Sequence, residues 1–111
     1  MRDDTVCLQA ILRSVDAIKS YLKPNPESIF IDRKTQKAIL RELHELSESS
    51  IRLSQSLKDL CLDVPWIAIA GFRNVIVHDY LGINIERVKE IIDNDLPILE
   101  KAITRIINKS E

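Results

Sequence analysis

The chain has 111 residues, of which 45% are hydrophobic and 30% are charged, with only two glycines and four prolines. This composition is typical of a helical globular protein and argues against a disordered or all-β chain. The length predicts one domain, residues 1–111, that is too short for a deep enzyme pocket, so a second chain is expected to complete any site. The formal net charge of −1 argues against a domain coated for nonspecific binding of nucleic acid.

The sequence also predicts a compartment. No apolar run approaches the length of a membrane span, and the N-terminal Met-Arg-Asp-Asp lacks the apolar core of a signal peptide. We therefore expect a cytoplasmic protein. Cys7 and Cys61 lack metal-type spacing, and in a reducing compartment we expect them to be buried free thiols.

Helical spacing of apolar residues predicts a first helix from about Asp4 to Leu22. Proline has no backbone N–H and restricts the residue before it, so Lys23-Pro24-Asn25-Pro26 is expected to end this helix. Residues 28–31 are expected to form a short turn that packs Ile29 and Phe30 inward.

A long second helix is predicted to follow Asp32, whose side chain is suited to cap its N-terminus. Its inward positions alternate at spacings of four and three through Ile39, Leu43, Leu46, Ser50, Leu53, Leu57 and Leu60. Such a stripe indicates either antiparallel packing within one domain or the seam of a dimer, and the spacing does not choose between them. Basic residues alternate with acidic ones on this helix, which favours a solvated face over a track for RNA. The isolated His44 is interpreted as a surface residue.

The third helix is predicted to begin at Asp63 or Val64, with Pro65 in its first turn, where a missing N–H does no harm. Gly71 lies inside this helix and costs about 1 kcal/mol of helix propensity relative to alanine. Close approach of another helix, from this chain or from a second copy, is expected to compensate. Leu81-Gly82 is expected to end the helix.

Asn84 is predicted to cap a fourth helix, and Asp93-Asn94-Asp95 followed by Pro97 marks a break or kink before a last helix. Together these segments predict an all-α fold, an up-and-down bundle of four to five helices. Because the chain is short and its candidate site is half built, we expect it to form a homodimer.

Polar side chains gather at the end of the third helix. After an apolar run from Pro65, the sequence places these groups within eight residues: Arg73, Asn74, His78, Asp79 and Tyr80. An arginine beside such a run needs a partner or a cleft, because an unpaired buried charge is very costly. In a helix, Arg73 and His78 would lie about 7.5 Å apart along the axis and about 140° around it, and so flank a groove. Such a groove suits a phosphodiester: the arginine holds the phosphate, the histidine moves a proton and Asn74 orients the substrate.

The stretch PWIAIAGFRNVIVHDYLGIN, with DRKTQKAILREL upstream, closely resembles the HepT-like toxins of the HEPN superfamily. The signature of that family is arginine, four residues, histidine, any residue and tyrosine, and Arg73, His78 and Tyr80 match its spacing. The resemblance extends from about residue 2 to the last helix. Two positions depart from the family pattern: Ile67 stands where relatives often carry arginine, which weakens an RNA contact, and Asn84 stands where they often carry aspartate.

The resemblance implies the toxin of a type II toxin–antitoxin pair. Such proteins are metal-independent endoribonucleases without a cofactor, and two copies would form one cleft for RNA. Arg73 and His78 would be the catalytic residues, with Asn74 and Asp79 in support. The resemblance also implies an antitoxin partner called MNT, a minimal nucleotidyltransferase that uses ATP and magnesium and can attach AMP to the tyrosine that corresponds to Tyr80.

Two other interpretations stay open. The chain is alternatively a non-catalytic helical binding module that partners a nucleotidyltransferase, or a purely structural helical dimer in which Arg73 pairs with an acid and His78 with a carbonyl group. Trp66 and Phe72 are interpreted as core residues and not as a platform for base stacking. The sequence offers no paired carboxylates, Ser/His/Asp order, glycine-rich phosphate loop or metal-ligand cluster, so hydrolysis would proceed without a bound metal.

Overall fold

The structure is a computed structural model that describes residues 2–72 and 84–110. Every regular element in these ranges is helical, which confirms the predicted all-α class. The elements are α1 (Arg2–Leu22), α2 (Ser28–Ile31), α3 (Arg33–Arg52), α4 (Gln55–Asp59), α5 (Trp66–Ala70), α7 (Ile85–Glu90), the π-helix η1 (Ile91–Asp95) and α8 (Leu96–Ser110). None of the helices in the described ranges has the length and apolarity needed to cross a bilayer.

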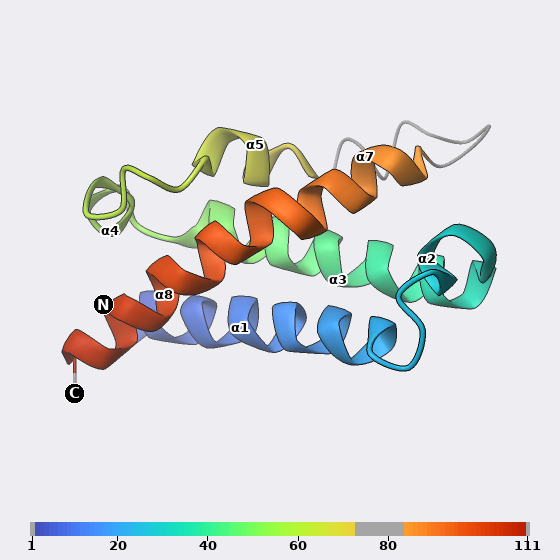
Figure 1. The fold of residues 1–111 in the computed structure, drawn as a ribbon. Helices are drawn as coiled ribbons and strands as arrows, with labels where there is room; N and C mark the ends of the chain where they lie inside the picture. Colours follow the sequence, from blue (N-terminus) through green and yellow to red (C-terminus); the bar gives the residue numbers. More distant parts are fainter. Residues whose placement is uncertain (1, 73–83, 111) are drawn as a thin grey trace.

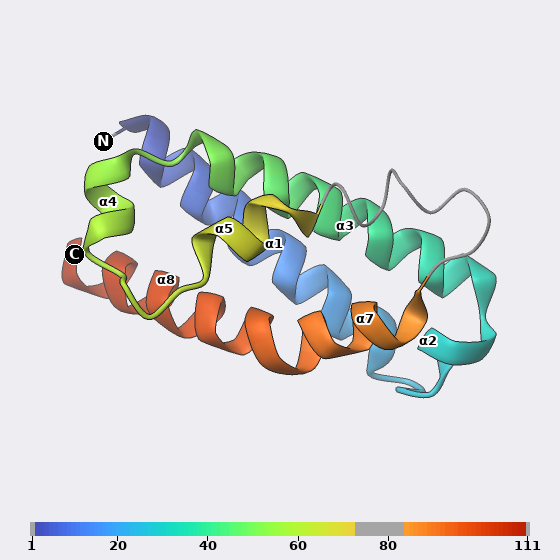
Figure 2. The same ribbon diagram turned by 90° about the horizontal axis from the view of Figure 1, so that it is seen from above.

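The two long helices α1 and α3 lie side by side and antiparallel, and α8 crosses them obliquely (Figures 1 and 2). Seen from above, the short helices α4 and α5 lie between α3 and α8 (Figure 2), and α2 contacts α7 at the other end of the molecule. The stripe predicted on the second helix is buried inside this arrangement at Ile39, Leu43 and Leu46. It therefore serves antiparallel packing within the chain and not a dimer seam.

The start of the bundle follows the sequence prediction in all but one residue. Asp32 caps α3, because its carboxylate accepts hydrogen bonds from the Lys34 backbone N–H at 3.2 Å and the Thr35 hydroxyl at 2.6 Å. Ile29 in α2 is fully buried as predicted. The prediction for Phe30 is wrong: its side chain is 42% exposed, since a helix of one turn cannot direct two successive residues into the same core.

The predicted long second helix is wrong beyond Arg52. The chain becomes extended at Leu53, and Ser54 caps a separate helix, α4, through a 3.3 Å bond from the Leu57 N–H to its hydroxyl. Asp4 on α1 accepts hydrogen bonds from the Ser54 N–H at 2.8 Å and from its hydroxyl at 2.7 Å. In a continuous helix the Ser54 N–H would bond to a carbonyl oxygen of the preceding turn, but here it bonds to the buried Asp4 carboxylate. The stripe accordingly fails at its last member, Leu60, which is 76% exposed.

The predicted break or kink at Asp93-Asn94-Asp95 is a single π-turn inside a continuous rod of α7, η1 and α8 (Figure 1). The Leu96 N–H bonds to the carbonyl oxygen of Ile91, five residues earlier. Pro97 has no N–H to donate, and the wider turn is one of the known ways in which helices accommodate such a residue. The helix therefore continues through an irregular turn where a break or kink was predicted.

The third predicted helix begins later than expected, at Trp66, with Pro65 in the N-cap position. The preceding residues form a compact connection: Cys61 and Val64 are buried, and the Val64 N–H bonds to the Cys61 carbonyl oxygen at 3.2 Å. Cys7 and Cys61 are both buried free thiols, as predicted.

Candidate functional site

The five residues predicted to form the site, Arg73, Asn74, His78, Asp79 and Tyr80, lie outside the described residues. The structure does describe the two elements that flank them in the chain. These are α5 with Phe72 on the N-terminal side, and Asn84 with α7 on the C-terminal side.

The N-terminal flank is attached firmly to α3. The Ser47 hydroxyl donates a 2.9 Å hydrogen bond to the carbonyl oxygen of Ala70, which belongs to the last turn of α5. Ile69 and Phe72 are buried on either side of this bond, at 0% and 1% exposure. The residue that precedes Arg73 in the chain is therefore held in the core.

No helix from the described part of this chain makes the close approach predicted at Gly71, and approach by a second copy stays a prediction. A Cβ atom built at Gly71 would lie 3.4 Å from the Ala68 carbonyl oxygen and 3.5 Å from that of Ile67, which is ordinary contact within its own turn. Among the described residues no other helix approaches this position within 4 Å. The glycine instead ends α5, where its N–H bonds to both of these carbonyl oxygens at 3.1 Å.

The C-terminal flank is a capped helix end. The Asn84 side-chain oxygen accepts a 3.1 Å hydrogen bond from the Arg87 N–H, which confirms the predicted cap. Val88 on the inner face of α7 is buried, and α7 contacts α2. Phe72 in the core and the capped start of α7 at Asn84 are thus both held in place, one on each side of the five site residues in the chain.

Trp66 and Phe72 are confirmed as core residues. The Trp66 ring packs partly buried against the core, and its Nε1–H donates to the Cys61 carbonyl oxygen at 3.1 Å. A tryptophan whose polar atom is satisfied inside the chain is positioned for packing. Phe72 is fully buried, whereas the partly buried Trp66 also lines a groove on the surface beside α4 and α5.

The charged residues of α3 form a solvent-exposed face, as predicted from the sequence. Arg41 and Glu45 form an exposed i,i+4 ion pair at 3.5 Å, and the neighbouring Lys37 and His44 are exposed. Within residues 2–72 and 84–110, no three histidine, cysteine or acidic side chains gather in a way that could hold a metal ion.

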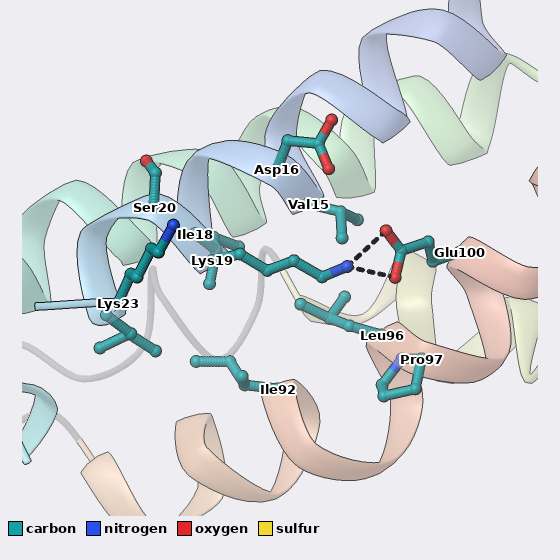
Figure 3. Close-up of a pocket in the computed structure, with 11 residues that line it drawn as sticks. Val15, Asp16, Ile18, Lys19, Ser20, Lys23, Ile92, Leu96, Pro97 and Glu100 are labelled. Atoms are coloured by element: carbon teal, nitrogen blue, oxygen red, sulfur yellow. Dashed lines mark hydrogen bonds and ion pairs between the residues drawn. The ribbon is translucent and has the colours of Figure 1, made fainter. Parts of the chain in front are cut away.

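A groove of about 640 Å³ lies apart from these elements, between the C-terminal half of α1 and the η1–α8 turn (Figure 3). Lys19 reaches across it from α1, and its Nζ lies 2.6 and 2.7 Å from the two carboxylate oxygens of Glu100 on α8. Ile18 and Leu96 form part of its apolar floor. None of the described lining residues is a histidine or an arginine, and we interpret the Lys19–Glu100 pair as a link between the two helices.

Two buried residues that join separate helices were missed by sequence reasoning, and one of them, Ser47, holds the flank of the site. Ser47 lies beside the buried stripe of α3, one residue after Leu46, and a buried serine is a signal that its hydroxyl has a hydrogen-bond partner. Asp4 was predicted as the approximate start of the first helix, and no local signal connects it with Ser54. Hydrogen bonds from the Ser54 hydroxyl and then from its N–H hold the pKa of Asp4 below its ordinary value of 3.8.

Comparison with known proteins defines the class. The family model described as "Ribonuclease HepT-like" matches residues 11–106, which is most of the chain. The chain therefore belongs to the HepT-like family of the HEPN superfamily, as the motif predicted. No solved structure matches the chain significantly.

Several curated relatives carry ribonuclease names. The chain is 36% identical over 80 residues to "Putative RNase MJ0127" of Methanocaldococcus jannaschii, covering 72% of this chain and 66% of that protein. It is 27% identical over 94 residues to "Probable ribonuclease HepT" of Thermococcus cleftensis, covering 84% and 86% of the two chains. A third relative, "Gamma-glutamylcyclotransferase and putative RNase MJ0434" of M. jannaschii, is 26% identical over 109 residues. The match covers 97% of this chain but only 49% of that protein, so the chain spans about half of that relative's length.

Proposed function

We propose that residues 1–111 form one domain that acts as the toxin of a type II toxin–antitoxin system, a metal-independent endoribonuclease. The observation that carries the proposal is the spacing of Arg73, His78 and Tyr80 in a chain of the HepT-like ribonuclease family. The ribonuclease names of its relatives support RNA as the substrate. We propose that the protein acts in the cytoplasm and that two copies form one cleft.

The proposed reaction is an internal transesterification. The ribose 2′-oxygen attacks the adjacent phosphorus, His78 takes the 2′ proton, and the bond from phosphorus to the 5′-oxygen breaks. The His78 of the second copy, or water, supplies a proton to the leaving 5′-oxygen, which leaves a 2′,3′-cyclic phosphate. Arg73 stabilises the charge that develops on the phosphorane, while Asn74 and Asp79 support the two catalytic groups. DNA lacks the 2′-hydroxyl and should resist cleavage.

The chemistry requires no metal in this proposal, because the nucleophile belongs to the substrate and a guanidinium group supplies the positive charge. Control of the activity is assigned to a nucleotidyltransferase antitoxin of the MNT type, which uses ATP and magnesium. Its proposed target on this chain is the Tyr80 hydroxyl.

The test is cleavage of RNA by purified wild-type protein and two variants. Arg73→Ala and His78→Ala are each expected to lower the rate about 100-fold or more, because each removes a charge stabiliser or a proton-transfer group. His44→Ala is the matched control, since His44 is the only other histidine and is exposed on α3. Activity is expected to persist in EDTA.

Two results would contradict the proposal. Loss of cleavage in EDTA would exclude the metal-independent mechanism, and an equal loss in His44→Ala would detach the activity from the motif. A wild-type protein that binds a nucleotidyltransferase but cuts no RNA and arrests no growth would instead support the non-catalytic binding module.

A further inference from the structure

Large aliphatic side chains are unusually exposed at and beside the connection between α4 and α5. Leu62 is 85% exposed and Ile67 is 92% exposed, and both line a groove of about 560 Å³ together with Pro65 and Trp66. We call these four residues and their groove the α4–α5 surface. Contiguous apolar surface of this kind usually marks a place where another molecule binds.

This surface is held rigidly although it is exposed. The Trp66 Nε1–H donates to the Cys61 carbonyl oxygen at 3.1 Å, and the Trp66 backbone N–H donates to the Val64 carbonyl oxygen at 2.9 Å. Cys61 and Val64 are themselves buried, so the connection is attached to the core on its inner side. Leu62 and Ile67 are therefore displayed by a fixed backbone, which lowers the ordering cost of binding.

We propose that the α4–α5 surface is where a second copy of this chain docks. Leu62 and Ile67 are exposed and line the groove themselves, an arrangement that a twofold contact can use. In an isologous pair, Leu62 and Ile67 of one copy can enter the groove of the other, and the reverse contact forms at the same time.

The charges around the surface favour a second copy over a strongly charged partner. Lys58 and Asp59 line the groove, and Asp63 beside it pairs with Arg105 at 3.5 Å. Each positive group is balanced by a negative one, so two copies of the surface do not repel each other and RNA gains no net attraction. An apolar centre with a charged rim is also the usual composition of a protein interface.

The surface is continuous in the chain with the candidate site. Ile67 lies on α5, and the end of α5 is fixed through the bond from Ser47 to Ala70, three residues before Arg73. A second copy docked on α5 is therefore brought next to the element that leads into the motif. This step rests on the proposed function, in which two copies complete one cleft.

The test is sedimentation velocity over a range of protein concentrations. Ile67→Lys and Leu62→Lys are each expected to weaken the dimer by about 30-fold or more, because they place a charge in the centre of an apolar contact. Ile31→Lys is the matched control: Ile31 is 77% exposed, but it lies on α2, outside the α4–α5 surface, and the change should leave dimerisation unaltered. Circular dichroism confirms that each variant is folded, and Leu62→Ser provides a milder change if a lysine disturbs folding.

The outcomes separate this inference from the proposed function. A monomeric wild type, or a dimer that survives both lysine variants, would overturn the α4–α5 surface as the contact between copies, whatever the ribonuclease assay shows. Loss of nucleotidyltransferase binding with an unchanged dimer would assign the surface to that partner and would also overturn the inference. A monomeric Ile67→Lys variant that still cleaves RNA would support the surface while removing the shared cleft from the proposed mechanism.

Discussion

The Ser47 hydroxyl on α3 donates a 2.9 Å hydrogen bond to the Ala70 carbonyl oxygen at the end of α5. Carbonyl groups in the last turn of a helix have no partner within the helix, so one that is covered by other elements needs a donor from elsewhere. Ser47 supplies that donor from a fully buried position. The bond thereby connects the most buried face of α3 with the chain that leads into Arg73.

Removal of this donor should affect both stability and activity. Ser47→Ala removes this donor from a part-buried carbonyl oxygen, and we expect the free energy of unfolding to fall by about 0.5–1.5 kcal/mol, measured by urea denaturation. RNA cleavage should fall as well, because the end of α5 is less firmly placed.

Ser50→Ala is the matched control for this change. Its hydroxyl is equally buried on α3 but bonds to the Ser47 carbonyl oxygen within the same helix, at 2.7 Å. We expect Ser50→Ala to leave cleavage per folded molecule unchanged. If both variants lose activity to the same extent, the bond to α5 has no special role in positioning the site.

The bond between Asp4 and Ser54 predicts a dependence of stability on pH. The Ser54 hydroxyl and N–H lower the pKa of the Asp4 carboxyl in the folded state, so the ionised form stabilises the fold above the ordinary value of 3.8. That contribution is lost as the pH falls through the lowered pKa. We expect Asp4→Asn to reduce the free energy of unfolding by about 1.5–3 kcal/mol at pH 7.

The difference in free energy of unfolding between wild type and Asp4→Asn should be constant above about pH 5. It should shrink as the pH falls below the pKa of the Asp4 carboxyl group in the unfolded chain. Urea denaturation at several pH values measures it. Asp3→Asn changes the exposed neighbouring carboxylate and should stay within about 0.5 kcal/mol of wild type at pH 7. A gap that widens in acid would show that Asp4 does not act through its ionised form.

The sequence predicted those features of the fold that depend on neighbours in the chain. Asp32 and Asn84 were found as caps because a capping side chain bonds to a backbone N–H two or three residues later. The end of α3 was missed because its cause is Asp4, fifty residues earlier. Phe30 and Leu60 were misplaced because periodicity tells which residues share a face, and only the packed fold tells whether anything covers that face.

For the candidate site, too, the sequence predicts local features but not those that depend on tertiary contacts. The identities of Arg73, His78 and Tyr80 follow from their spacing, because the chemistry of the residue types is a property of the sequence. The supports of the flanking chain do not: Ser47 bonds to Ala70 across 23 positions, and the exposure of Ile67 depends on which face of α5 the packed fold leaves uncovered. Such contacts depend on tertiary packing and leave only a weak trace in local sequence.

Tyr80 is expected to be the point of control. In a helix it would lie on the Arg73 stripe at i+7 and two residues from His78, so its hydroxyl should reach the mouth of the same cleft without being needed for proton transfer. An AMP group esterified there would bring a negatively charged phosphate towards Arg73 and would place a bulky adenosine in the path of RNA. Modification would thus imitate and block the substrate together.

We therefore predict that Tyr80→Phe keeps appreciable ribonuclease activity but escapes modification by the nucleotidyltransferase. The measurement is the intact mass of each protein after incubation with the partner, ATP and magnesium. Tyr21→Phe is the matched control, because Tyr21 is the only other tyrosine and its hydroxyl already donates to Glu42 on α3 at 3.2 Å. The adduct should appear on wild type and Tyr21→Phe and be absent from Tyr80→Phe. Equal adduct mass on all three proteins would place the modification elsewhere, and inhibition by the antitoxin would then have to act through a surface other than the motif.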